Sequence, residues 1–386
     1  MDTVIERLSN DGAGVGRHPD GRVLFVAGTA PGDHVRVRII EAQRRLLRGE
    51  VEELLTPGPG RVEPRCPLVD RCGGCSWQHV DYETQLAAKA DIVADALRRI
   101  AKLDLEDPVE MVPSPSPYEY RSRARLLVRG GRPGFRAAAS RDHVPVDDCP
   151  VLAAPLRAAL AELAAATRAN GEWELALGEP SAAWPDGVRC APLAEGAEDL
   201  ELSAGGARVR IVAGGFAQAN ALLLAALVDA VCAAAGRGAA LLELYAGAGF
   251  LTLPLARAFE RVLAVEAVAP AVERLRSAAL EAGLRHVEAR AEDAGRFAES
   301  PALTAFAPDV VCVDPPRAGL APEVVTALCR PGPRRLIYLS CDPATLARDL
   351  ADLHAGRWRV ASLCAFDLFP QTPHVETLVR LERGTP

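Results

Sequence analysis

The chain has 386 residues, which is more than one ordinary hydrophobic core organises and indicates two or three domains. Hydrophobic residues make up 49% and charged residues 25%, and the net charge of −7 argues against a uniformly basic nucleic-acid-binding surface, although it does not locate the charges. No apolar run approaches the about 18 residues that cross a membrane, and the first residues lack the features of a signal peptide, so we expect a cytoplasmic protein with reduced thiols and no membrane partner.

Residues 1–57 consist of short β-rich segments separated by turns. The segments are TVIERLS, RVLFVAG, DHVRVRIIEA and LLRGEVEEL, and the turns are DGAG, HPDG and APGD. Several short strands joined by tight turns are typical of a small, nearly closed β-barrel. The Pro- and Gly-rich stretch TPGPGRVEP follows as a linker.

A group of cysteines follows the linker. Cys66, Cys72 and Cys75 have the spacing C-x5-C-x2-C, and Cys149, which precedes a proline, is the best candidate for a fourth ligand. Three close cysteines and one distant Cys-Pro suit a four-cysteine iron–sulfur cluster of the 4Fe-4S type. Zinc, which is usually held by paired C-x2-C motifs, and free cysteines in a hydrophobic core are the alternatives.

Residues 58–214 form the second predicted region. After the cysteines comes a helix, YETQLAAKADIVADALRRIA, and from about residue 118 the pattern is mostly β, interrupted by an Ala-rich helix at 155–168. Residues 121–141, RSRARLLVRGGRPGFRAAASR, contain arginines and no acidic residue. This stretch predicts either a phosphate-contacting stripe or an ordinary solvated strand face.

Residues 215–386 alternate apolar strands with helices. The expected strands are ALLELY, RVLAVEA, VVCVDPP, RLIYLSC and ETLVRLER. This alternation predicts a doubly wound, Rossmann-like α/β domain. Ligands of such sheets bind at the carboxyl ends of the strands.

The first strand of this domain ends in a glycine loop that favours one class of cofactor. Gly247 and Gly249 allow a tight turn and a close approach of a ligand, but Thr252 replaces the third glycine that seats a pyrophosphate. Glu266 ends the second strand, where an acid binds ribose hydroxyls, and Asp293 is a candidate for facing the adenine. A glycine loop without a diphosphate site, together with a ribose-binding acid, predicts S-adenosylmethionine as the cofactor.

The fourth strand ends in Asp314, two prolines and Arg317. The prolines fix an extended loop at the edge of the crevice. Asp-Pro-Pro is also typical of methyltransferases that act on exocyclic base nitrogens, in which a following aromatic residue stacks on the flipped base. Arg317 stands there instead, which weakens that alternative.

A thiol at a strand end requires a chemical explanation. Cys341 follows the apolar run RLIYLS, and Glu376 lies in FPQTPHVETLV, where the last strand begins. C5 of a pyrimidine is not nucleophilic, but a thiolate that adds to C6 lets C5 attack a methyl donor, and a base must then remove the C5 proton. Methyl transfer to nitrogen or oxygen needs no enzyme nucleophile. The other cysteines outside the group are expected to be small buried hydrophobes: Cys190, Cys232, Cys312, Cys329 and Cys364.

The motifs LSCDPATLARD, DPPRAG, FPQTPHVET and the glycine loop together resemble the RNA (uracil-5-)-methyltransferase family, and the similarity extends over the whole chain. The resemblance implies that Cys341 is the nucleophile and Glu376 the general base. It also implies that residues 1–57 are a TRAM domain, an RNA-binding variant of the OB fold, and that the chain belongs to the iron–sulfur branch. The implied contacts to cofactor and uracil are Gln218, Tyr245, Glu266 and Asp314, and, by a looser motif, Asp293. Phe250 stands where some members have a polar residue.

The resemblance implies an enzyme that uses S-adenosylmethionine to form 5-methyluridine in a structured RNA, whose target uridine leaves its stack to reach Cys341. The cysteine group favours 23S ribosomal RNA as the substrate, and tRNA is the alternative. Two other interpretations are an exocyclic-amine nucleic-acid methyltransferase and a non-catalytic RNA-binding assembly factor. We expect the protein to be a monomer.

Overall fold

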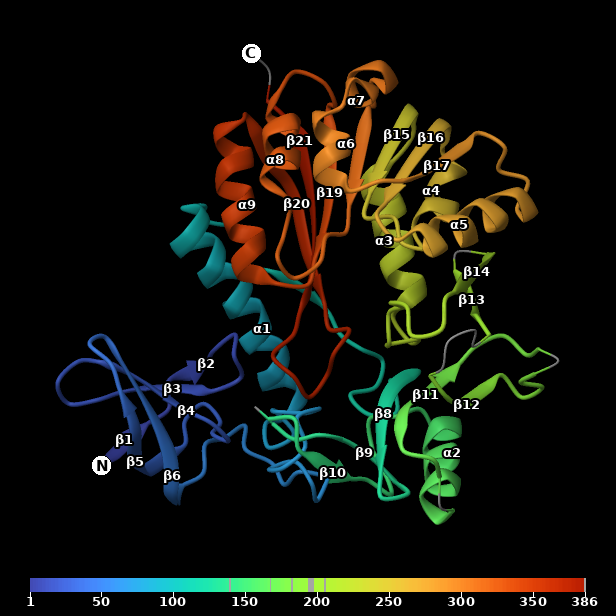
Figure 1. Ribbon diagram of the computed structural model, residues 1–386. Helices are drawn as coiled ribbons and strands as arrows, with labels where there is room; N and C mark the ends of the chain where they lie inside the picture. Colours follow the sequence, from blue (N-terminus) through green and yellow to red (C-terminus); the bar gives the residue numbers. More distant parts are fainter. Residues whose placement is uncertain (139, 167, 182, 194–197, 205, 385–386) are drawn as a thin grey trace.

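The structure is a computed structural model that describes residues 1–138, 140–166, 168–181, 183–193, 198–204 and 206–384. The described strands form sheets of six, five, two and eight strands. Figure 1 shows the six-stranded sheet in blue and, at the opposite end of the molecule, the eight-stranded sheet in yellow to red with helices on both faces. A helix, α1 (Tyr82–Ala96), runs between these two parts.

The N-terminal sheet has the strand order β1-β5-β6-β4-β3-β2. Alternation along β5 buries Val35 and Val37 and exposes Arg36 and Arg38, as expected for a strand with one face on a core. The buried valines pack in a small cluster with apolar residues of the neighbouring strands. The strand bounds are β1 (Asp2–Val4), β2 (Arg7–Leu8), β3 (Gly14–Arg17), β4 (Val23–Val26), β5 (His34–Ala42) and β6 (Leu46–Thr56).

The central sheet has the order β10-β9-β8-β11-β12, with antiparallel neighbours. Helix α2 (Ala154–Ala165) packs on it through Leu156, Leu160 and Leu163, which recur at helical spacing and are fully buried. The helix expected at 155–168 includes residue 167, which lies outside the described residues. The strands of this region are β8 (Arg123–Arg129), β9 (Arg132–Arg136), β10 (His143–Pro145), β11 (Gly171–Leu177), β12 (Val188–Pro192) and the paired β13 (Leu200–Ala204) and β14 (Ala207–Ile211).

The eight-stranded sheet has the order β17-β16-β15-β18-β19-β21-β20-β7. Its first five strands are parallel, and β21 is antiparallel to β19 and β20. Its edge strand β7 (Glu110–Val112) comes from the central part of the chain, and neither β7 nor β20 is among the strands expected from sequence. The other elements are α3 (Leu224–Ala235), β15 (Gly238–Leu244), α4 (Thr252–Ala256), β16 (Phe259–Glu266), α5 (Ala269–Glu281), β17 (Val287–Ala291), α6 (Ala294–Glu299), α7 (Pro301–Phe306), β18 (Val310–Val313), α8 (Pro322–Cys329), β19 (Arg335–Ser340), α9 (Pro343–Ala355), β20 (Trp358–Phe366) and β21 (Glu376–Arg383).

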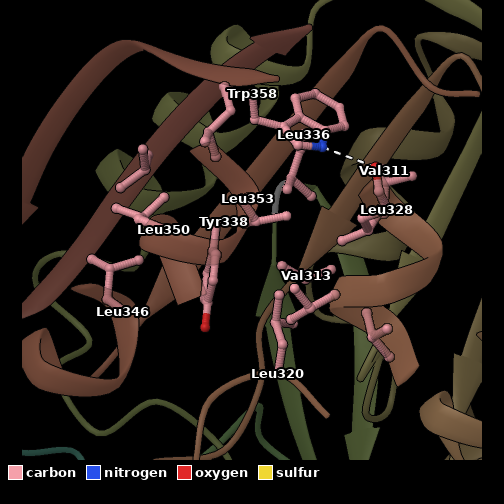
Figure 2. Packing of buried hydrophobic residues seen from close by; sticks show 14 of the residues in the cluster. Val311, Val313, Leu320, Leu328, Leu336, Tyr338, Leu346, Leu350, Leu353 and Trp358 are labelled. Atoms are coloured by element: carbon pink, nitrogen blue, oxygen red, sulfur yellow. Dashed lines mark hydrogen bonds between the residues drawn. The ribbon is translucent and has the colours of Figure 1, made fainter. Parts of the chain in front are cut away.

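Apolar side chains fill both faces of this sheet. Figure 2 shows Leu336 and Tyr338 of β19 among the leucines of α9. The indole of Trp358, which is fully buried in this core, is paired, since its Nε1 donates a hydrogen bond to the Leu328 carbonyl oxygen at 2.9 Å. A close-packed core of this kind holds the strand ends in fixed positions. No helix within the described ranges is long and apolar enough to cross a membrane.

Candidate active site

Five strands bring side chains to one edge of the eight-stranded sheet. The strand register pairs Ser340 of β19 with Thr377 of β21, which sets Cys341 and Glu376 next to each other at this edge. Parallel neighbours contribute the residues expected from separate segments of the sequence: Tyr245 after β15, Glu266 at the end of β16, and Asp314 after β18.

Cys341 and two carboxyl groups influence one another strongly. Burial, followed by the nearby Glu376 and Asp314, raises the pKa of Cys341 to about 11, and Arg317 opposes this rise. Burial also raises the pKa of Asp314 to about 7. Burial, with a contribution from Asp314, raises the pKa of Glu376 well above its ordinary value. Glu376 is 1% exposed, and its Oε1 has no hydrogen-bond partner in the described part of the chain, so this oxygen can accept a proton from a bound substrate.

The glycine loop lies against Glu266. Gly249 has a φ of 95°, and a Cβ there would lie 2.9 Å from Leu275 Cγ, so only glycine fits. Gly247 N donates to Glu266 Oε2 at 3.0 Å, and Val268 N donates to Oε1 of the same carboxylate at 2.8 Å. These hydrogen bonds hold the Glu266 carboxylate beside the glycine loop.

Tyr245 and Asp293 lie close to each other. Tyr245 has a φ of 63°, which is unusual for a residue with a side chain, and its hydroxyl oxygen accepts a hydrogen bond from Ala321 N at 3.3 Å. Burial raises the pKa of Tyr245, and Asp293 is among the acids that add to the rise. Asp293 also caps α6, because its Oδ1 accepts a hydrogen bond from Arg296 N at 3.1 Å. A ligand can therefore use the other carboxyl oxygen.

A cavity of about 300 Å³ lies between the central region and the C-terminal domain. Gln218 and Phe250 line it on one side, and Ser122 and Glu179 belong to the central region. The Gln218 Oε1 atom is buried and has no hydrogen-bond partner among the described residues, so a bound donor would satisfy it. Phe250 adds an apolar ring to the lining of this cavity.

Sequence analysis missed Glu243, a carboxyl group inside β15. It is 3% exposed. Burial raises its pKa to about 8, and Asp314 and Glu266 add to the rise. The signal was present in the sequence, because an acid interrupts the apolar run ALLELY.

Sequence analysis also missed His374, which contacts the Asp-Pro-Pro loop. Arg317 Nη2 donates a hydrogen bond to His374 Nε2 at 3.1 Å. Burial, followed by the positive charges of Arg317 and Lys89, lowers the pKa of His374 to about 4, so the ring is neutral and can accept this bond. The contact joins two loops of the site that are far apart in the sequence.

Similar proteins of known name identify the family. A family model described as tRNA (Uracil-5-)-methyltransferase matches residues 197–384, and a TRAM domain model matches residues 3–51. The 23S rRNA (uracil(1939)-C(5))-methyltransferase RlmD of Pseudomonas putida is 33% identical over 98% of this chain and 93% of its own length. The crystal structure of Pyrococcus abyssi tRNA (uracil-54, C5)-methyltransferase in complex with S-adenosyl-L-homocysteine is similar with a TM-score of 0.75 and 25% identity, over 99% of this chain and 100% of that chain. The chain belongs to the RNA (uracil-5-)-methyltransferase family.

This RNA (uracil-5-)-methyltransferase therefore uses S-adenosylmethionine to methylate C5 of uridine in RNA. The expected α/β fold and the N-terminal TRAM domain are confirmed. The family assignment also decides against the exocyclic-amine methyltransferase and the non-catalytic assembly factor.

The four expected ligand cysteines of the methyltransferase are neighbours. Burial, with a contribution from Cys66, raises the pKa of Cys72. Burial, with Cys149 and Cys72, raises the pKa of Cys75 to about 12, and burial with Cys72 raises that of Cys149 to about 11. Within the described ranges, no group of three or more His, Cys, Asp or Glu side chains has the geometry that holds a metal ion.

The other cysteines lie in or beside the cores. Cys312 is fully buried, as expected for a small hydrophobe. The remaining ones are half-buried and pack against the hydrophobic clusters from their edges: Cys190, Cys232, Cys329 and Cys364. They lie where a core meets the surface.

The arginines of residues 121–141 do not form a continuous cationic stripe. Several of them pair with acids from outside the stretch: Arg123 with Glu174, Arg132 with Asp147 at 3.0 Å, and Arg136 with Glu172 at 3.4 Å. Strand pairing brings these acids close, and the sequence of the stretch alone does not reveal them. Arg129 and Arg141 are exposed and are better candidates for phosphate contacts.

Proposed function

We propose that the methyltransferase forms 5-methyluridine by a covalent mechanism in which Cys341 is the nucleophile and Glu376 is the general base. The observation that supports this most directly is the register of β19 and β21, which sets the Cys341 thiol beside a buried Glu376 carboxyl group. Methylation of a base nitrogen would need no enzyme nucleophile, because the nitrogen provides its own electron pair.

In this mechanism the Cys341 thiolate adds to C6 of the uracil and moves electron density through C5 to O4. S-adenosylmethionine supplies the methyl group as a sulfonium when it is bound. C5 forms the new bond to the methyl carbon as the bond from that carbon to sulfur breaks. The Glu376 carboxylate then takes the C5 proton, the C5–C6 double bond re-forms, and the bond between C6 and Cys341 Sγ breaks. The raised pKa of Glu376 makes its ionised form a stronger proton acceptor.

We expect the cofactor to bind along the strand ends. Glu266 already accepts two backbone hydrogen bonds, but a carboxylate offers about four lone-pair positions, so ribose hydroxyls can still donate to it. The unpaired Gln218 Oε1 is a further acceptor. The full set proposed to hold S-adenosylmethionine is Gln218, Tyr245, Gly247, Gly249, Glu266, Asp293 and Asp314.

We favour 23S ribosomal RNA as the substrate and keep tRNA as the alternative. The relative from Pseudomonas putida, at 33% identity, is named for a ribosomal RNA uridine, whereas the similar structure from Pyrococcus abyssi, at 25% identity, is named for a tRNA uridine. Residues 3–51 match the TRAM model and would contribute to RNA binding. We propose a cytoplasmic monomer as the active form.

We propose that Cys66, Cys72, Cys75 and Cys149 hold a 4Fe-4S cluster, as in the iron–sulfur branch of the family. The donor set fits, since four thiolates are the ligands of such clusters. Zinc is usually held by paired C-x2-C motifs, and the C-x5-C-x2-C spacing of Cys66, Cys72 and Cys75 contains one such pair. Zinc is therefore the weaker alternative.

Mass spectrometry on anaerobically purified protein tests whether Cys341 is the nucleophile and whether the reaction passes through a covalent adduct. The protein is incubated with S-adenosylmethionine and RNA that contains 5-fluorouridine, in which fluorine cannot leave C5 as a proton. We expect a protein–RNA adduct with one added methyl group at Cys341, which the Cys341→Ala variant does not form. Methylation of a base amine without an adduct would overturn the mechanism.

Metal analysis of the same preparation tests the cluster. About four irons and four labile sulfides per chain are expected for a 4Fe-4S cluster, and Cys149→Ser should lose them. One zinc per chain and no iron would overturn this assignment.

A further inference from the structure

The loop between β20 and β21 (residues 367–375) leads directly into Glu376 and is held by distant parts of the chain. Figure 1 shows this red loop leaving the C-terminal domain and reaching toward α1 and the central region. Lys89 of α1 is fully buried, pairs with Asp367 at 2.5 Å, and also donates to the Phe369 carbonyl oxygen at 3.0 Å. Tyr120 of the central region donates its hydroxyl to the Pro370 carbonyl oxygen at 3.0 Å. The position of the loop is therefore set from outside the C-terminal domain.

Gln371 is at the centre of these contacts. Its φ is 68°, a left-handed conformation that is unfavourable for a residue with a side chain and persists only where the surroundings enforce it. Its backbone N donates to Gln85 Oε1 at 2.9 Å, and Gln85 Nε2 donates to Gln371 Oε1 at 3.0 Å. Both glutamines are buried, so each hydrogen bond would leave an unsatisfied group if its partner were removed.

The same residue contacts the four-cysteine segment. The Gln371 carbonyl oxygen accepts hydrogen bonds from Ser76 N at 2.9 Å and Trp77 N at 3.0 Å. These residues directly follow Cys75. Two residues that follow Cys75 in the chain are therefore hydrogen-bonded to the loop that leads into the proposed base.

We propose that Gln85 and Gln371 are positioning residues for Glu376, and that Ser76 and Trp77 make the position of the β20–β21 loop depend on the four-cysteine site. This inference rests on the proposed function, because it takes Glu376 as the base. It assigns the cysteine site a role in one chemical step. When a bound cluster holds the four-cysteine segment in place, Glu376 lies where it can remove the C5 proton. When this segment is released, proton removal slows, but the earlier addition of Cys341 to C6 continues.

The Gln85→Met variant tests the positioning role, because methionine keeps the size of the side chain and removes both hydrogen bonds to Gln371. It also removes the hydrogen bonds that Gln85 Nε2 donates to the Trp77 and Val80 carbonyl oxygens, at 3.1 Å and 2.8 Å. Glu83→Met, on an exposed position of the same helix, is the matched control. With natural RNA, we expect Gln85→Met to lower kcat and KM together by roughly tenfold or more, to leave kcat/KM nearly unchanged, and to accumulate the methylated Cys341 adduct, because the slowed step follows methyl transfer. The rate of adduct formation with 5-fluorouridine RNA should stay within about twofold of wild type, because proton removal is not part of it.

A second variant, Gln371→Gly, tests whether misfolding explains the effect of Gln85→Met. Gln371→Gly accepts the left-handed backbone and removes only the side-chain contacts, so it should reproduce the accumulation seen with Gln85→Met. A parallel loss of both adduct formation and turnover in the two variants would mean a general structural role and would overturn the positioning role. Absence of a 5-fluorouridine adduct in the wild-type protein would instead overturn the proposed function.

Hydrogen exchange tests the link to the cysteines without measuring activity. Exchange in residues 367–375 is compared between the intact protein, the same protein after iron chelation, and Cys75→Ser. We expect roughly tenfold faster exchange in this loop after either change, because two of its hydrogen bonds come from the released segment. Faster exchange confined to residues 66–77, with residues 367–375 unchanged, would overturn the link.

Discussion

At the residue scale, the site opposes ionisation of the proposed nucleophile, Cys341. Burial and the carboxyl groups of Glu376 and Asp314 raise the pKa of Cys341 to about 11, and Arg317 opposes them. At neutral pH nearly all of Cys341 is therefore the thiol, which resists oxidation while no RNA is bound. The neutral His374 ring holds the Arg317 guanidinium, so the geometry of this opposing charge depends on the β20–β21 loop.

The rate at which iodoacetamide alkylates Cys341 at pH 9 should depend on the charges of Glu376 and Arg317, because they shift the pKa of this thiol. The thiolate is the reactive form, and below the pKa its fraction rises about tenfold per pH unit. Glu376→Gln removes a negative charge and lowers the Cys341 pKa, so alkylation should become about three- to tenfold faster; Arg317→Gln raises the pKa and should slow it by a similar factor. Peptide mass spectrometry measures the rate, with the distant Cys329 as an internal reference. Equal rates in wild type and both variants would contradict this account.

At the scale of elements, strand pairing decides what a charged side chain does. Neighbouring strands β8, β11 and β12 bring together Arg123, Glu174 and Arg189, which are 8%, 0% and 1% exposed. Glu174 pairs with both guanidinium groups, at 3.1 Å for Arg189 Nε to Glu174 Oε2. The sequence of β8 alone suggested an arginine surface, but one of its arginines is part of a buried ion cluster.

Replacing the central acid should therefore be far more disruptive than replacing its exposed neighbour. Glu174→Gln leaves two buried guanidinium groups without a counter-charge, and we expect it to lower the free energy of unfolding by about 3–5 kcal/mol. Glu172→Gln, on the same strand, removes an exposed ion pair and should change it by less than about 1 kcal/mol. Denaturant unfolding followed by circular dichroism measures both variants. Similar losses of stability in the two would refute the importance of burial here.

The pairing of elements also explains which features the sequence could predict and which it could not. The strands β15, β16, β18 and β19 are apolar runs between helices, and the glycine loop, Cys341 and Glu376 lie in compact motifs, so local patterns were sufficient. The three-residue β7 and the partly exposed β20 carry no comparable pattern, since β7 becomes a strand only by pairing with β20. His374 was missed for the same reason, because its role comes from a contact with a distant loop.

At the scale of the whole molecule, Trp77 joins the N-terminal sheet to the rest of the chain. Its ring is fully buried in a cluster that includes Leu8 and Ala30 of the N-terminal part and Ile92 of α1. Its Nε1 donates to the Gly12 carbonyl oxygen at 2.9 Å. Trp77 N also donates a hydrogen bond to the β20–β21 loop, so the TRAM domain, the four-cysteine segment and this loop meet at one residue. Such a junction couples the stabilities of parts that have separate cores.

A comparison of Trp77→Phe with Trp358→Phe should reveal this coupling between the N-terminal sheet and the rest of the chain. Both tryptophans are buried, and each donates a hydrogen bond to a carbonyl oxygen. Trp77→Phe and Trp358→Phe each remove an indole hydrogen bond of 2.9 Å from a fully buried ring, and each should lower the free energy of unfolding by about 1–3 kcal/mol. Trp358 lies within the C-terminal core, whereas Trp77 lies at the junction, so only Trp77→Phe should let the N-terminal sheet open independently. Native-state hydrogen exchange of residues 14–37 measures this: we expect these amides to exchange faster in Trp77→Phe than in Trp358→Phe at matched global stability. Indistinguishable exchange in the two variants would show that the domains unfold independently of Trp77.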